Sequence, residues 1–279
     1  MSLVDQLVDA GSCSRLFIDG GSNMGESVTA FLKGAMYRCA VASPSRLYGK
    51  AWKNATRRTQ LEWMSPLGRT SEWCIRSFDA SPGIAAKLQQ ENTHGPNVRY
   101  IDAALGTHTS PKAPREIIRY SNHSFGLTTG AFSHYDLHLD KPPELEKWTH
   151  HGPSLDVREI IRRYKGTAKS IALKLDVEGH EFAILHALAD EPELLCSIDY
   201  LFTEYHNLKF NATKYGWPED LYARTGAKIL NAMDNYPNCK LRINWRSFWS
   251  ACGEPMKFLW MGSFQATGIN KTAGGGRSG

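Results

Sequence analysis

One short segment of the chain holds residue types that transfer protons. Residues 173–181, LKLDVEGHE, place Lys174, Asp176, Glu178 and His180 close together. Because side chains alternate along an extended chain, the two acids and the histidine share one side if the segment stays extended. We therefore expect acid–base chemistry here, with Asp176 or a histidine as the base and Lys174 holding an acidic partner or orienting a substrate. A structural ion pair for Lys174 and a helix-covering position for His180 are the open alternatives.

A second acid–histidine pair, Glu204 and His206, follows a later apolar run with the same spacing. Carboxylate and imidazole groups of this kind also bind divalent metals. A magnesium or manganese ion held by Asp176, Glu204 and His206 is therefore an alternative to a metal-free site.

A glycine turn comes early in the chain. Residues 19–25, DGGSNMG, follow the apolar residues 16–18 and precede an amphipathic stretch over 26–33. Glycines allow unusual dihedrals and leave room for a ligand to approach the backbone, although such a turn also serves packing alone. Asp19 and Asn23 stand where a pyrophosphate would prefer only backbone donors. The turn therefore favours a cationic ligand with an amino acid end, such as S-adenosylmethionine.

A second acid, Asp79, closes the apolar run 74–78. A carboxylate after the second strand of a nucleoside-binding sheet accepts hydrogen bonds from both ribose hydroxyls. The alternative is that Asp79 only caps a helix that begins near Pro82. The distance from Asp19 is longer than the roughly 20 residues usual for these features, and a basic insertion accounts for the difference.

These groups must be positioned by alternating strands and helices. Such alternation predicts a parallel sheet with helices on both faces and ligands at the carboxyl ends of its strands. The expected strands cover residues 16–18, 74–78, 97–101, 116–120, 170–175, 198–203, 240–245 and 258–264, and the expected helices cover 26–33, 82–90, 155–164, 181–189 and 219–233.

Several motifs together resemble the FkbM-like methyltransferases. DGGSNMGES is similar to that family's D-x-G-A-N-x-G motif, with Ser22 in place of the common alanine. FDASP around Asp79, DAALG from Asp102, SLDV from Ser154 and LKLDVEGHE follow in the family's order, the last being similar to K-I-D-V-E-G-x-E. The matches span about residues 17–206. The departures are an aspartate at position 79, where the family often has glutamate, and the basic insertion.

The resemblance implies a Rossmann-like class I methyltransferase: an α/β fold with a seven-stranded, mostly parallel sheet flanked by helices, using S-adenosylmethionine. Gly21, Asn23 and Gly25 would line the methionine end, Asp79 the ribose, and Asp102 with Ala103 the adenine. The expected cofactor set is Asp19, Gly20, Gly21, Ser22, Asn23, Gly25, Glu26, Ser27, Asp79, Ala80, Ser81, Asp102, Ala103, Ala104 and Asp176. The expected catalytic set is Lys174, Asp176, Glu178, His180, Glu204 and His206.

The resemblance also suggests the acceptor, a hydroxyl of a sugar, glycan or related natural product. Methylation of RNA through the basic insertion is an alternative, as is a non-catalytic nucleoside-binding module. A net charge of +5 over 279 residues is modest and does not demand a nucleic-acid partner. We therefore expect a small-molecule or glycan partner.

One methyltransferase domain is expected over residues 1–267, with a glycine-rich, disordered tail over 268–279. The insertion, about 43–73, carries Trp52, Trp63 and Trp73 and is either a substrate lid or a solvated loop. No apolar run approaches the roughly 20 residues that span a bilayer. The oligomeric state and the compartment stay open.

The cysteines and the glycosylation triplets give the remaining signals. The cysteines show no CxxC pair and no metal-ligand spacing, and their pairing stays open. Four Asn-X-Ser/Thr triplets would be used only if a longer parent protein enters the secretory pathway. The six cysteines are Cys13, Cys39, Cys74, Cys196, Cys239 and Cys252, and the triplets begin at Asn54, Asn122, Asn211 and Asn270.

Overall fold

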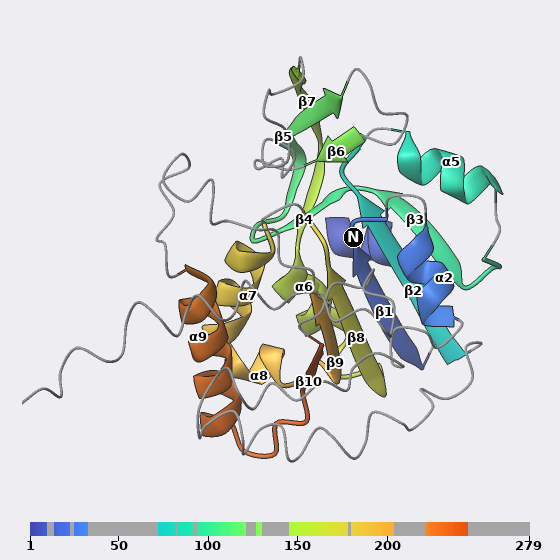
Figure 1. Ribbon diagram of the computed structural model, residues 1–279. Coiled ribbons are helices and arrows are strands. Elements are labelled where there is room, and N and C mark those ends of the chain that lie inside the picture. Colours follow the sequence, from blue (N-terminus) through green and yellow to red (C-terminus); the bar gives the residue numbers. More distant parts are fainter. Residues whose placement is uncertain are drawn as a thin grey trace, which may run out of the picture.

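The fold is an α/β arrangement built around two sheets (Figure 1). The computed structural model describes residues 1–9, 14–22, 25–32, 72–81, 83–91, 94–120, 127–129, 145–177, 180–203 and 221–244. The expected strand over 258–264, the tail over 268–279 and residues 43–71 of the insertion lie outside these ranges.

The larger sheet has six strands in the order β10-β9-β8-β1-β2-β3, and every pairing among them is parallel. The four inner strands are buried along almost their whole length, as expected where helices cover both faces. The sheet confirms the expected mostly parallel architecture. Its strands are β1 (Arg15–Gly20), β2 (Trp73–Asp79), β3 (Val98–Asp102), β8 (Ser170–Leu175), β9 (Tyr200–Thr203) and β10 (Arg242–Asn244).

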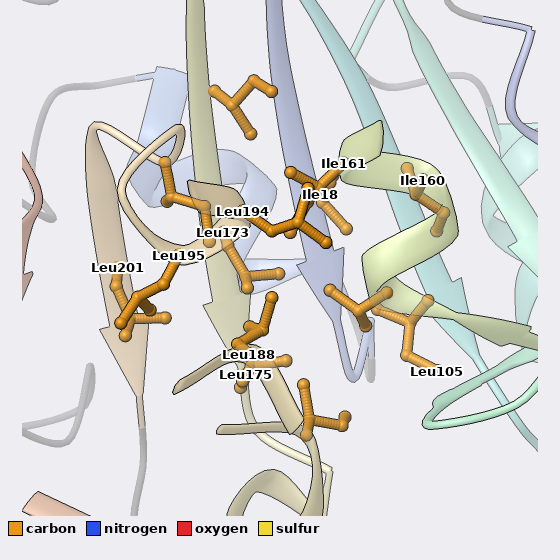
Figure 2. Close-up of a cluster of buried hydrophobic side chains, with 14 of the residues drawn as sticks. Ile18, Leu105, Ile160, Ile161, Leu173, Leu175, Leu188, Leu194, Leu195 and Leu201 are labelled. Atoms are coloured by element: carbon orange, nitrogen blue, oxygen red, sulfur yellow. The ribbon is translucent and has the colours of Figure 1, made fainter. Parts of the chain in front are cut away.

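Alternate side chains of β1 feed two separate cores. Leu16 and Ile18 join a cluster with residues of α1, α6, α7, α8 and α9, whereas Phe17 joins a cluster with residues of α2 and α5. Figure 2 shows the first cluster, with Ile160 and Ile161 packed over the sheet. The helices are α1 (Leu3–Val8), α2 (Glu26–Leu32), α5 (Ile84–Glu91), α6 (Val157–Tyr164), α7 (Glu181–Ala189), α8 (Pro192–Leu195) and α9 (Leu221–Asn235).

A smaller second sheet was not expected from the sequence beyond one strand over 116–120. Its strands are ordered β4-β7-β5-β6, with β5 antiparallel to both its neighbours. The β7 sequence, LEKWTHHGPSLD, is polar and contains a Gly-Pro pair, a composition typical of loops. The strands are β4 (Ala104–Gly106), β5 (Ser110–Tyr120), β6 (Leu127–Thr129) and β7 (Leu145–Asp156).

Helix starts follow local chemistry. The Asp156 carboxylate accepts a hydrogen bond from the backbone N–H of Arg158 at 2.8 Å and caps α6. Asp156 is therefore the N-cap, and α6 begins at Val157, two residues later than the expected start at residue 155. The observed bounds of β8 and α7 coincide with those expected.

Candidate functional site

The expected polar residues meet at the carboxyl edge of the larger sheet. Asp19 on β1 lies in register with Ser77 on β2 and with Lys174 on β8. Asp79 at the end of β2 lies in register with Asp102 at the end of β3. Four neighbouring strands therefore bring acids and one cation to the same edge, which is where open parallel sheets bind their ligands.

Asp19 is enclosed by protein groups. Its side chain is fully buried, and its Oδ2 accepts hydrogen bonds from Ser27 Oγ at 2.8 Å and Ser77 Oγ at 2.5 Å. Ser22 Oγ lies 2.8 Å from Ser77 Oγ and extends the network into the turn. A buried carboxylate needs such partners, so in this arrangement Asp19 holds the turn and the start of α2 in place.

Lys174 links the glycine turn to the end of β8. Its Nζ donates to the backbone oxygen of Gly21 at 2.8 Å and lies 3.4 Å from Asp19 Oδ1 and 3.2 Å from Asp176 Oδ2. The lysine is 2% exposed, and two carboxylates compensate its buried charge. Of the interpretations left open by the sequence, the geometry supports the one in which Lys174 holds acidic partners.

The glycines of the turn are required by close packing within the protein. Gly21 has φ +88°, and a Cβ there would lie 2.0 Å from the backbone oxygen of Asp176. Gly25 has φ +80°, and a Cβ there would lie 2.9 Å from the Tyr100 hydroxyl. Both positions exclude side chains. The turn is therefore packed directly against the segment after β8 and against β3.

Three backbone amides in the described part of the turn have acceptors within the protein. The N–H groups of Gly21 and Ser22 both donate to the oxygen of Phe78 at 2.9 Å, and the N–H of Gly25 donates to the oxygen of Ser22 at 2.7 Å. A pyrophosphate site needs such amides to point at the ligand. Glu26 also places an acid in the first turn of α2, where a phosphate would be repelled. In the described part of the turn, these features favour a ligand other than a pyrophosphate.

Asp79 forms a local turn at the end of β2. It is 7% exposed, and its Oδ1 accepts from the backbone N–H of Ser81 at 2.8 Å. This is a turn interaction two residues along the chain, and α5 begins only at Ile84. On the neighbouring strand, Asp102 at the end of β3 is exposed, and Ala103 after it is buried. The edge thus has one enclosed and one open carboxylate in register.

His180 stands at the start of α7, against the end of β4. A Cβ on Gly106 would lie 3.4 Å from both His180 Nε2 and Ser154 Oγ. Burial lowers the pKa of His180, the nearby Glu181 opposes this effect, and His108 adds to it. The imidazole is therefore neutral at pH 7, the form that accepts a proton.

The condition under which Asp176, Glu178 and His180 would share one side, an extended chain up to His180, is not met. The N–H of His180 donates to the oxygen of Val177 at 3.2 Å. The chain therefore turns before α7 begins, and simple alternation does not place Asp176 and His180 on one side. Asn23, Glu178, Glu204 and His206 lie outside the described residues. Among the residues that the structure does describe, no group of three or more His, Cys, Asp or Glu side chains is arranged to hold a metal ion.

Sequence reasoning assigned Trp73 to the insertion, but Trp73 begins β2. It is 1% exposed and packs edge-on against Phe31 with ring centroids 5.0 Å apart. Trp73 is therefore a core residue and not part of a substrate lid. The full span of β2 is apolar apart from Arg76, Ser77 and Asp79, which could have placed Trp73 in the strand.

Two further polar features were missed. Tyr100 OH lies 2.8 Å from His94 Nδ1, and His94 Nε2 lies 2.8 Å from Thr29 Oγ1. This chain of contacts ties β3 to α2 beside Gly25. Ser77, which bonds Asp19, had one signal in the sequence, a small polar residue inside a buried apolar strand. Tyr100, His94 and Thr29 had none, because their contacts join segments far apart in the chain.

Comparison of the chain with models of known families, with curated proteins and with solved structures finds no match. No helix in the described ranges combines the length and apolar character needed to cross a membrane.

Proposed function

We propose that this chain is an S-adenosylmethionine-dependent methyltransferase of the FkbM-like kind. Its acceptor would be a hydroxyl of a sugar, glycan or related natural product. One observation carries the proposal. The backbone amides of Gly21 and Ser22 both donate to the backbone oxygen of Phe78, and Asp79 and Asp102 lie in register with each other at the ends of β2 and β3. A pyrophosphate would find these amides already bonded and would be repelled by the carboxylates. The same carboxylates would attract a sulfonium cation and accept hydrogen bonds from ribose hydroxyls.

The residues present fit this cofactor by their chemistry. The turn and the start of α2 would hold the methionine end through Gly20, Gly21, Asn23, Gly25 and Glu26. Ser22 and Ser27 are buried and bonded to Ser77 and Asp19, so they would shape the turn from within. Asp79, with Ala80 and Ser81, would accept the ribose hydroxyls, and Asp102, Ala103 and Ala104 would lie along the adenine. Asp19 and Lys174 would act indirectly, because both are buried and hold the turn.

Of the candidate bases described, His180 suits the task better than Asp176. Asp176 lies 3.2 Å from the Lys174 ammonium, so its carboxylate is already engaged in an ion pair within the protein. His180 has a pKa lowered by burial and is ready to accept a proton at neutral pH. Bound S-adenosylmethionine would supply a methyl group whose carbon–sulfur bond breaks as the acceptor oxygen bonds to carbon, sulfur keeping the electron pair.

Calorimetry with S-adenosylhomocysteine, and with NAD⁺ and ATP as phosphate-bearing comparators, tests the cofactor assignment on the full chain. We expect saturable binding of S-adenosylhomocysteine and none of either comparator. Preferential binding of NAD⁺ or ATP would contradict the proposal. Transfer of a radiolabelled methyl group from S-adenosylmethionine to monosaccharides and glycan fragments then tests the acceptor class.

A further inference from the structure

A disulfide bond joins Cys196 to Cys239, 43 residues apart in the chain. Cys196 follows the short helix α8, and Cys239 lies between α9 and β10. Cys239 packs against the first core cluster, and Cys196 directly follows Leu194 and Leu195, which are buried in it. The bond therefore ties the corner before β9 to the chain that enters the edge strand.

The edge strand β10 is short, and the disulfide bond helps to keep it docked on the sheet. β10 has three residues and pairs with β9 through three register positions. A short edge strand contributes little pairing of its own. The link closes the loop that contains α9, restricts the unfolded chain and favours the docked edge. In a reducing environment this loop would be open.

Cys74 is also disulfide-bonded. It is 2% exposed within β2, beside the central strand β1. No cysteine in the described ranges is free. Structural disulfides persist in secreted proteins and oxidising lumens and are rare in the cytosol, where thiols are kept reduced. The four Asn-X-Ser/Thr triplets are usable in the same oxidising pathway.

We infer that this protein folds and acts in an oxidising compartment, and, resting on the proposed function, that its acceptor is a glycan hydroxyl presented there. An RNA methyltransferase would meet its substrate in the cytosol or nucleus, where structural disulfides are rare. The disulfides thus separate the two acceptor classes that the sequence leaves open. This distinction between acceptors does not depend on the basic insertion.

Thiol trapping on protein taken from the cells that make it tests the compartment. Cells are lysed in N-ethylmaleimide before any reduction, and the peptides are mapped by mass spectrometry. We expect a linked Cys196–Cys239 peptide without maleimide adducts, and glycans that a glycosidase removes from the asparagine of one or more triplets. Maleimide on both cysteines would overturn the inference, whatever the state of the asparagines.

A variant tests whether the fold uses the bond. Cys196→Ser with Cys239→Ser should lower the Tm by roughly 5 to 15 °C, while Lys240→Ala, at an exposed neighbouring position, should leave it unchanged. An unchanged Tm in the double variant would contradict a structural need for oxidation.

The acceptor is tested on the oxidised chain with radiolabelled S-adenosylmethionine, offering glycan fragments and total RNA side by side. Label on the glycan fragments alone supports the inference, whereas label on RNA, or none on the glycans, overturns the acceptor assignment. The compartment result is independent of cofactor binding. Trapped disulfides without S-adenosylhomocysteine binding would therefore refute the proposed function alone.

Discussion

Lys174 Nζ donates a 2.8 Å hydrogen bond to the backbone oxygen of Gly21, so a buried cation on β8 holds the turn that follows β1. The same ammonium lies between Asp19 and Asp176. The turn and the segment after β8 are consequently one connected unit. Disturbing one side of this unit should be felt on the other.

Replacing Lys174 with Met should destabilise the protein strongly. The change leaves Asp19 buried beside Asp176 without a compensating cation, and removing one partner of a buried ion pair costs roughly 3–5 kcal/mol. Urea unfolding measures this loss. Lys165→Met is the control, because the Lys165–Glu193 pair lies at the surface and exposed pairs contribute little. Equal unfolding midpoints for the two variants would show that the buried network carries no stability.

Tyr100→Phe should weaken S-adenosylhomocysteine binding several-fold. It removes only the hydroxyl that contacts His94 and supports Gly25, at a cost in stability of about 1 kcal/mol. Thr29→Val removes the hydroxyl at the other end of this hydrogen-bond network and should also weaken binding. Thr29→Ser keeps a hydroxyl there and should bind as tightly as the unaltered protein. Tyr236→Phe, outside this network, serves as the control. Loss of Tm without any change in affinity would show that these residues support the fold and not the turn.

The pH dependence of stability should reveal His180. Because its folded-state pKa is lowered, the unfolded chain binds the proton more readily, and stability falls as the pH drops below the unfolded pKa of about 6.5. His180→Asn should reduce the stability lost between pH 7.5 and pH 5.5. Burial also lowers the pKa of His186, so some dependence will persist. An identical pH profile in the variant would rule out a buried neutral imidazole.

His180→Asn also tests the base in catalysis. It should retain S-adenosylhomocysteine binding while transfer falls by about 100-fold or more, and the acid limb of the pH–rate profile should disappear. Asp176→Asn should keep that limb, because the base remains in place. If Asp176→Asn instead abolishes transfer and His180→Asn does not, the base is Asp176.

The sequence predicts much of the larger sheet because each of its elements is defined locally. β8 is apolar apart from Ser170 and Lys174, and α7 is the next element along the chain, so their bounds agree with expectation. The second sheet escaped prediction, since β7 is polar and gains its pairing from β5 across a long separation. Strand order decides such contacts, and local patterns do not reveal it.

The same distinction applies to the site. Strand-end acids such as Asp79 and Asp102 are visible in the sequence because each follows an apolar run. Two partners of Lys174, Asp19 and Gly21, are not visible, because their contacts depend on β1 and β8 being neighbours in register. The turn at Val177 that displaces His180 was missed for a related reason: the chain must reverse before α7 packs on the sheet.

Calorimetry with S-adenosylhomocysteine on Asp79→Asn tests most directly whether Asp79 receives the ribose of S-adenosylmethionine. Asparagine keeps the side-chain oxygen that accepts from Ser81 and removes the charge. We predict at least about tenfold weaker binding than in the unaltered chain, since hydrogen bonds to a charged group contribute about 1.5–3 kcal/mol, with Asp234→Asn unchanged as the control. Equal affinity in all three proteins would contradict the account.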